Sequence, residues 1–325
     1  MKKNLTFLLI TYNQEKYIIY TLDSIKYQIV NYLHEYEIQL IIADDASCDQ
    51  TENLITDWID KNKNLFFDIT YNRNQTNQGI NKNLRLSFKD IKGEYTKLIS
   101  GDDMLPQNSI EIFLEELNDN DMVMGIPLYF MDSSIGSEWK KTLSHIANEY
   151  LDGKRTYLNR MNESCFVHGC SLFLNSKLLR NSNVEKFMSN FEFLEDYPMW
   201  YAMGKEFDDI KFKFVVEIAI LYRRTENSVC FIRNNVIRKD RKKMAKYILK
   251  SKKVNLYSKL VKINEYIVFS IGNRYLQIYG LLDNYIQHIR RKRVMNYIEE
   301  KYGRFIKIRA QENDRYLKML INEKE

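Results

Sequence analysis

The first hundred residues alternate short apolar runs with longer segments of helical period, and this alternation limits the possible folds more than any other feature. The apolar runs cover residues 5–11, 38–43, 66–71 and 95–99. Helical patterns extend to about residue 30 after the first run and to about residue 62 after the second, and cover 81–91 after the third. Strands that alternate with helices of about 10 to 15 residues predict a Rossmann-like α/β fold, with a mostly parallel sheet and helices on both faces.

Polar residues follow these apolar runs directly. Thr-Tyr-Asn at 11–13 follows the first run, Asp44-Asp45 the second and Asp102-Asp103 the fourth. Ligands of open parallel sheets bind at the carboxyl ends of the strands, so the three groups are expected to share one edge. Paired carboxylates can bind Mg²⁺ or Mn²⁺, although a single acidic pair can also do no more than end a strand. Ser47 with Gln50 further predicts a capping box for the following helix.

The second half of the chain has a looser pattern. Residues 122–130, 166–174 and 214–222 are predicted strands, whereas 133–157 has no clear period. From about residue 236 the pattern is helical and cationic. Residues 231–325 hold 24 Lys and Arg against 9 Asp and Glu, whereas residues 1–230 hold 25 against 34. This asymmetry predicts a catalytic domain over 1–230 and a basic helical region over 231–325.

Composition excludes several classes of protein. Hydrophobic residues make up 45% and charged residues 28%, which excludes wholesale disorder. The apolar run in residues 1–10 is too short for a signal peptide, and no stretch reaches the roughly 20 apolar residues of a membrane span. The four cysteines, at positions 48, 165, 170 and 230, lack metal-site spacing and are expected to be reduced thiols. These features predict a cytoplasmic protein.

Four motifs in order resemble the family 2 glycosyltransferases. They are ITYNQEKY, IIADDASCDQT, NQGINKNL and GEYTKLISGDD, and the resemblance covers about residues 4–230. It implies a GT-A fold and an inverting, nucleotide-sugar-dependent enzyme of bacterial surface-polysaccharide synthesis. Two alternatives stay open: a catalytically silent GT-A domain that binds nucleotide sugar or acts as a scaffold, and a nucleotidyltransferase. A nucleotidyltransferase would usually carry a glycine-rich basic loop after the first strand, and TYNQEKY has no glycine.

The resemblance assigns roles to the residues at the strand ends. Thr11, Tyr12 and Asn13 would line the nucleotide pocket. Asp45 would accept a hydrogen bond from the base, typically uracil N3–H, and Asp102 would lie near the ribose and diphosphate. Asp103 would be the principal ligand of Mn²⁺ or Mg²⁺. Asp44 and Asp49 are less certain, because Asp49 can equally support the turn.

Further motifs of the resemblance lie downstream. Glu195-Asp196 looks like the family's acidic motif, in which Asp196 would be the catalytic base; the alternative is an acid at a helix N-terminus. In Tyr222–Ser228 (YRRTENS), Arg223 or Arg224 would neutralise the leaving group, whereas Thr225 replaces a frequent histidine and makes metal ligation there doubtful. His168 would line the sugar and acceptor pocket or be purely structural. A Cys–His hydrolase using Cys165 or Cys170 is the least favoured reading.

The basic region has three interpretations. It can lie on an anionic membrane surface, which would suit a lipid-linked oligosaccharide acceptor. It can pack on the catalytic domain with its lysines and arginines in solvent, or both can hold together. Nucleic acid binding is the least favoured. The expected partners are therefore a nucleotide-sugar donor, most simply a UDP-sugar, a glycan acceptor and an anionic membrane surface, with no nucleic acid.

Overall fold

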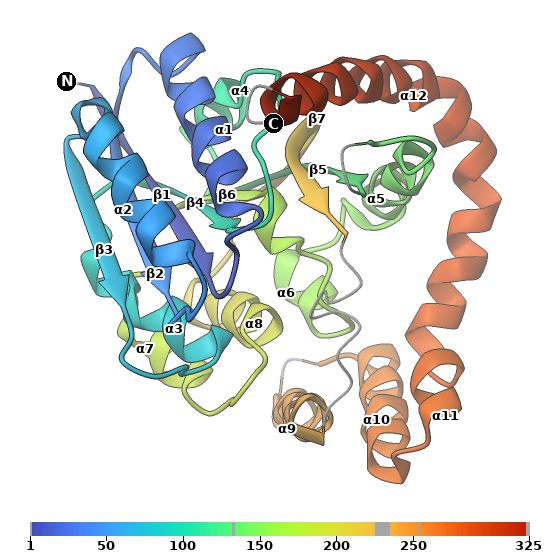
Figure 1. Cartoon of the computed structure of the whole chain (residues 1–325). Coiled ribbons are helices and arrows are strands. Elements are labelled where there is room, and N and C mark those ends of the chain that lie inside the picture. Colours follow the sequence, from blue (N-terminus) through green and yellow to red (C-terminus); the bar gives the residue numbers. More distant parts are fainter. Residues whose placement is uncertain (1, 132–133, 225–234, 253, 323–325) are drawn as a thin grey trace.

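A seven-stranded sheet forms the centre of the molecule (Figure 1). The computed structural model describes residues 2–131, 134–224, 235–252 and 254–322. The strands are β1 (Lys3–Thr11), β2 (Tyr36–Asp44), β3 (Asp68–Arg73), β4 (Tyr95–Ser100), β5 (Met122–Phe130), β6 (Leu172–Asn175) and β7 (Phe212–Arg223). Their order across the sheet is β3-β2-β1-β4-β6-β5-β7. Only β6 runs against its neighbours, so the other strands end at one common edge.

Helices cover both faces of this sheet. Those of the first two thirds of the chain are α1 (Ile18–Asn31), α2 (Thr51–Asn62), α3 (Ile80–Leu86), α4 (Glu111–Glu116), α5 (Trp139–Asp152), α6 (Tyr157–Met161), α7 (Ser182–Met188) and α8 (Asp196–Glu206). Those of the last third are α9 (Asn235–Lys250), α10 (Leu256–Ile271), α11 (Arg274–Tyr279) and α12 (Leu282–Asn322). Short 3₁₀ turns lie at Lys63–Leu65, Phe88–Asp90 and Gly169–Ser171. The predicted α/β fold with a helical C-terminal region is confirmed.

The two faces of the sheet have separate apolar cores because strand side chains alternate between faces. On β1, Phe7 packs with α1, α2 and α4, whereas Leu8 packs with α3, α7 and α8. A third core joins β5 and β7 to α5 and α12. The helices α9 and α12 both contribute residues to these cores. The interpretation that the basic region packs on the catalytic domain therefore holds for these two helices.

Several local predictions are wrong for identifiable reasons. The strand predicted at 166–174 begins only at Leu172, because Gly169–Ser171 forms a 3₁₀ turn. The capping box does not form: α2 starts at Thr51, whose backbone N–H is bound by Asp49, while Ser47 donates its hydroxyl to Asp44. The region without clear period contains α5, whose buried side is short and centred on Leu143, Ile146 and Ala147.

Figure 1 shows α9 and α10 at one end of the molecule and α12 running from α11 along its side to the opposite end. The 41-residue α12 packs against α5 and reaches α1. Among the described residues, no helix combines the length and the apolar character needed to cross a bilayer.

Candidate active site

The loops after β1 and β2 are tied together by Asn13. Its backbone N–H donates to Ser47 Oγ at 2.9 Å, and its side-chain oxygen accepts from Cys48 N at 2.9 Å. Asn13 has a φ of 52°, a left-handed conformation that asparagine tolerates better than most residues. Thr11 is buried beside it, and Tyr12 is 43% exposed. The three predicted residues thus lie together at the carboxyl edge of the sheet, with Tyr12 open to a ligand.

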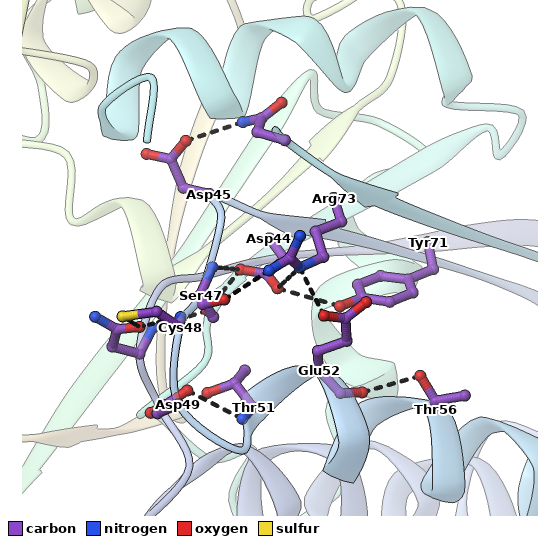
Figure 2. Close-up of polar contacts among 12 residues, drawn as sticks. Asp44, Asp45, Ser47, Cys48, Asp49, Thr51, Glu52, Thr56, Tyr71 and Arg73 are labelled. Atoms are coloured by element: carbon purple, nitrogen blue, oxygen red, sulfur yellow. Dashed lines mark hydrogen bonds and ion pairs between the residues drawn. The ribbon is translucent and has the colours of Figure 1, made fainter. Parts of the chain in front are cut away.

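Asp44 is a structural carboxylate at the end of β2. Figure 2 shows it enclosed by Ser47, Tyr71 and Arg73. It accepts hydrogen bonds from Ser47 N at 2.9 Å and Tyr71 Oη at 3.1 Å, and Arg73 Nε lies 3.7 Å away. Because Asp44 is fully buried among these partners, its role is to hold the β2 loop.

Asp45 holds a second loop. Its carboxylate accepts hydrogen bonds from Gln78 N at 2.7 Å, Gly79 N at 2.8 Å and Asn74 Nδ2 at 2.9 Å. Gly79 has a φ of 81°, which favours glycine at this turn. A carboxylate can accept about four hydrogen bonds, so three are already made within the chain. Recognition of a nucleotide base by Asp45 stays a prediction.

The end of β4 comes very close to the end of β1, and Gly101 makes this possible. Its backbone N–H donates to Ile10 O at 2.9 Å, and a Cβ at this position would lie 2.7 Å from Thr11 Oγ1. The next residue, Asp102, accepts a 2.6 Å hydrogen bond from Ser100 Oγ. The pair Asp102-Asp103 is therefore fixed directly beside Thr11.

Asp103 is the residue best suited to bind a cation. It is 1% exposed, and its Oδ1 accepts from Arg223 N at 3.0 Å. Its Oδ2 has no donor in hydrogen-bond geometry among the described residues. Burial, followed by the charge of Asp102, raises the pKa of Asp103 well above its ordinary value. A divalent ion at Oδ2 would compensate this buried charge, so the site fits the predicted metal.

Protein side chains alone do not complete a metal site. No cluster of three His, Cys, Asp or Glu side chains suited to a metal occurs in the described part of the chain. Mg²⁺ is commonly held by one or two carboxylates together with substrate phosphates and water. Asp103, with Asp102 next to it, would therefore hold Mn²⁺ or Mg²⁺ only together with a phosphorylated ligand.

Arg223 joins the end of β7 to this acidic pair. Its Nε donates to Asp102 O at 2.9 Å, and its guanidinium lies between the rings of Tyr17 and Phe130, 4.4 and 4.5 Å from their centroids. The neighbouring Arg224 lies over Tyr129. Both predicted arginines are thus at the carboxyl edge. Thr225 to Ser228 and Cys230 lie outside the described residues.

Asp196 is the first residue of α8, and its carboxylate faces the segment 168–170. A Cβ at Gly169 would lie 2.8 Å from Asp196 Oδ1. The partly buried thiol of Cys170, next in the chain, is influenced by the charges of both Asp103 and Asp196. The predicted base and the predicted metal ligand therefore both lie near this short segment.

Burial makes Asp196 a weaker acid than usual. Burial raises the pKa of Asp196, and burial together with the charge of Asp196 raises the pKa of Glu195. A raised pKa near the working pH is what a general base requires. The alternative interpretation, an acid at a helix N-terminus, is compatible with the same placement at the start of α8.

Sequence reasoning missed Asp240, which lies on α9. This buried carboxylate accepts hydrogen bonds from Phe193 N at 2.7 Å, Leu194 N at 3.0 Å and Glu192 N at 3.1 Å. It therefore fixes the loop that ends in Asp196. The available signal was that Asp240 is the single acid of α9, which carries seven lysines and arginines.

His168 belongs to an aromatic cluster at the ends of β5 and β7. Its Nδ1 pairs with Ser171 Oγ at 2.9 Å, and its ring centroid lies 5.0 Å from that of Tyr222 and 5.9 Å from that of His145. His145 Nε2 in turn pairs with Tyr129 Oη at 2.8 Å. Burial lowers the pKa of His168 to about 3 and that of His145 to about 4, so both imidazoles are neutral near pH 7.

The same burial disfavours a Cys–His hydrolase. It raises the pKa of both Cys165 and Cys170, whereas a nucleophilic cysteine needs a lowered one. His168 is already paired with Ser171. The hydrolase interpretation is therefore disfavoured.

Comparison with known proteins decides the family. The profile of the family described as glycosyl transferase family 2 matches residues 6–181, more than half of the chain. The chain belongs to this family. The matched residues include both strand-end acidic pairs and His168, whereas Asp196, Arg223 and Arg224 lie beyond the match.

Two named relatives illustrate the similarity. The abequosyltransferase RfbV of Salmonella typhimurium is 34% identical over 108 residues, which are 33% of this chain and 31% of the relative. The minor teichoic acid biosynthesis protein GgaB of Bacillus subtilis is 25% identical over 174 residues, 52% of this chain and 18% of the relative. The matched part of this family 2 chain thus spans under a third of either relative.

Solved structures share the fold over almost the whole chain. Residues 1–349 of S. aureus TarS, solved with UDP-GlcNAc, match with a TM-score of 0.56 and 15% identity, covering 98% of this chain and 90% of that one. The mannosyltransferase PcManGT from Pyrobaculum calidifontis, solved with GDP-Man and Mn²⁺, matches with a TM-score of 0.55 and 14% identity, covering 99% and 88%. At this identity the match establishes the fold alone.

Proposed function

We propose that this chain is an inverting glycosyltransferase that moves a sugar from a nucleotide diphosphate donor, a UDP-sugar, to a growing glycan. The observation that carries the proposal is that Asp103 and Asp196 both lie near the segment 168–170. One is a buried carboxylate whose Oδ2 has no donor in standard geometry among the described residues, and the other is a carboxylate of raised pKa. Family membership supports the same reading.

The donor would bind along the carboxyl edge of the sheet. Thr11, Tyr12 and Asn13 would line the nucleoside pocket, Asp45 would bind the base and Asp102 the ribose and diphosphate. The nucleotide sugars in the TarS and PcManGT structures support a donor of this chemical class.

The reaction would be a direct displacement. Asp196 would take the proton of an acceptor hydroxyl while the oxygen of that hydroxyl forms a bond to the anomeric carbon. The bond from this carbon to the diphosphate oxygen would break on the opposite side, which inverts the anomeric configuration. Arg223 and Arg224 would stabilise the charge on the departing diphosphate. Mn²⁺ or Mg²⁺, held by Asp103, would supply Lewis-acid stabilisation of the same charge.

The acceptor would be a lipid-linked glycan of a bacterial surface polysaccharide. The names of the abequosyltransferase and the teichoic acid protein support this class. Residues 1–230 would form the catalytic domain, and the basic region 231–325 would keep it on the cytoplasmic face of an anionic membrane. The division at residue 230 falls in 225–234, outside the described residues.

Calorimetric titration with UDP and GDP, with and without Mn²⁺, tests the donor site. We expect Mn²⁺-dependent binding of UDP that Asp103→Ala abolishes and Asp119→Ala, an exposed acid in the turn before β5, leaves unchanged. If the wild-type chain binds neither nucleotide, the proposal is wrong. Turnover of a matching UDP-sugar, followed by NMR of the anomeric proton of the product, then tests inversion.

A further inference from the structure

Helix α10 leaves its larger aliphatic side chains in solvent and buries a mixed face against the protein. Five aliphatic side chains at helical spacing form what we call the α10 stripe: Leu256, Leu260, Ile263, Ile267 and Ile271. Their exposed fractions lie between 45% and 74%. The opposite side of the helix buries Val261 and Val268 together with Ser258, Lys262 and Glu265. An ordinary surface helix turns its large apolar residues to the core, whereas α10 exposes five of them.

Polar contacts explain why α10 takes this orientation. Lys262 forms an ion pair with Glu265, and its ammonium lies 4.9 Å from the centroid of the Tyr197 ring. Arg241 of α9 lies 3.9 Å from Glu265, and Ser258 Oγ donates to Glu163 at 3.1 Å. Buried charges are costly unless they are paired, so these partners hold this face inward and leave the stripe outside.

Further exposed apolar side chains lie on the two helices that follow α10. They are Tyr275 and Leu276 on α11 and Leu282, Tyr285 and Ile289 on α12. Single exposed apolar residues are ordinary, whereas a row of them such as the α10 stripe marks an interaction surface. The tyrosines are typical of a membrane interface, where their rings contact lipid and their hydroxyls contact water.

Basic side chains lie beside the stripe. Helix α9 packs on α10 and carries seven lysines and arginines. Lys242 lies 5.5 Å from the ring centroid of Tyr266, and Lys239, Lys246 and Lys250 are exposed. In a symmetric pair of chains these cations would face their own copies and repel them, whereas anionic lipid headgroups would attract them.

We infer that α10 lies in the surface of an anionic membrane, with the α10 stripe among the acyl chains and the lysines of α9 at the headgroups. The polar side of α10 contacts Tyr197, the residue after the proposed base. A helix is about 10 to 12 Å across, so Asp196 would stand about one helix diameter above the lipid. This inference rests on the proposed function in one respect only, namely that the acceptor is carried by the membrane.

Insertion of the α10 stripe and attraction by charge alone predict different dependences of vesicle binding on salt. Electrostatic docking fails in high salt, because the Debye length falls to about 3 Å at 1 M, whereas insertion of aliphatic side chains does not. We expect the chain to sediment with vesicles that contain phosphatidylglycerol, and a measurable fraction to stay bound in 1 M salt. Binding to pure phosphatidylcholine should be much weaker at low salt.

A triple variant, Leu260→Ser with Ile263→Ser and Ile267→Ser, tests the stripe directly. These side chains are exposed, so the fold should survive, which circular dichroism checks. We expect partitioning onto phosphatidylglycerol vesicles to fall about a hundredfold, because three aliphatic groups no longer leave water. The matched control, Val30→Ser with Ile112→Ser, changes exposed aliphatics on α1 and α4 and should bind as the wild type does.

Several outcomes would overturn the inference. Unchanged vesicle binding by the triple variant would show that the α10 stripe does not contact the membrane. Equal binding to neutral and anionic vesicles would show that the lysines of α9 do not contribute. A wild-type dimer that the triple variant converts to monomer, without vesicle binding, would assign the stripe to a second copy of the chain. UDP binding in the presence of Mn²⁺ is measured in parallel on the wild type and on the variants. If none of them binds UDP, the proposed function is refuted while the vesicle result still stands.

Discussion

At the scale of single residues, Asp196 is the group whose chemistry can be tested most directly. Asp196→Asn is nearly isosteric but cannot accept a proton. We expect turnover to fall about 10²- to 10⁴-fold with an unchanged Kd for UDP, measured by steady-state kinetics and calorimetry. Wild-type turnover, or lost nucleotide binding, would contradict the assignment.

The pH profile of the wild type gives a second measurement on Asp196. The base acts only when unprotonated, and burial raises its pKa above the ordinary value of about 3.9. Turnover should therefore fall on acidification at a pH well above 4. Because Glu195 is adjacent and also raised, the observed acidic limb belongs to the pair. Glu195→Gln leaves one titrating carboxyl in place of two, so the acidic limb should then report Asp196 alone.

Gly169 has no side chain and so lets the same carboxylate approach its backbone closely. Gly169→Ala places a methyl group 2.8 Å from Asp196 Oδ1, which is closer than the atoms can approach, so the carboxylate has to move. We expect a large loss of turnover with a folded chain and intact UDP binding. Gly136→Ala serves as the control, because a Cβ there meets no atom within 4 Å; its positive φ can cost stability, but the site should stay active.

At the scale of elements, α9 orders the catalytic loop through Asp240. Asp240→Ala leaves the N–H groups of 192–194 without an acceptor, and an unsatisfied buried donor costs about 1 to 3 kcal/mol. We expect lower turnover and lower stability, with UDP binding kept. Asp240→Asn retains one acceptor oxygen for these N–H groups and should recover part of the turnover. Asp60→Ala, at an exposed acid of α2, is the matched control.

At the scale of the whole molecule, α12 is part of the folded body. Leu317 is fully buried in the core that joins α12 to α5, β5 and β7. Leu317→Ala should lower the free energy of unfolding by about 2 to 5 kcal/mol, measured by urea denaturation with one shared transition. Met319→Ala, at a side chain that is 44% exposed, should change it little. Two separate transitions would instead indicate an independent C-terminal unit.

Much of the site could be predicted from the sequence because its signals are local. One apolar run is followed by Thr-Tyr-Asn and two others by paired aspartates. Each of these signals can be recognised from adjacent residues alone. The parallel sheet then brings those ends to one edge. The positions of Thr11, Asp45 and Asp103 follow from this topology, although their roles stay predictions. Asp196 and His168 lie outside these strand ends. The capping box is absent because Ser47 is bound to Asp44 and to Asn13, which lies 34 residues earlier in the sequence.

The sequence by itself determined which residues of a helix share a face, and only the tertiary structure decided which face is buried. The period of α10 groups Leu256, Leu260, Ile263 and Ile267 whatever the helix packs against. Their exposure depends on ion pairs and hydrogen bonds of Lys262, Glu265 and Ser258 with partners that include Glu163 and Arg241. Asp240 is a second example, because its carboxylate accepts hydrogen bonds from backbone N–H groups about 46 residues earlier in the chain. A local pattern contains no information on such partners, because the fold brings them together only after every element is placed.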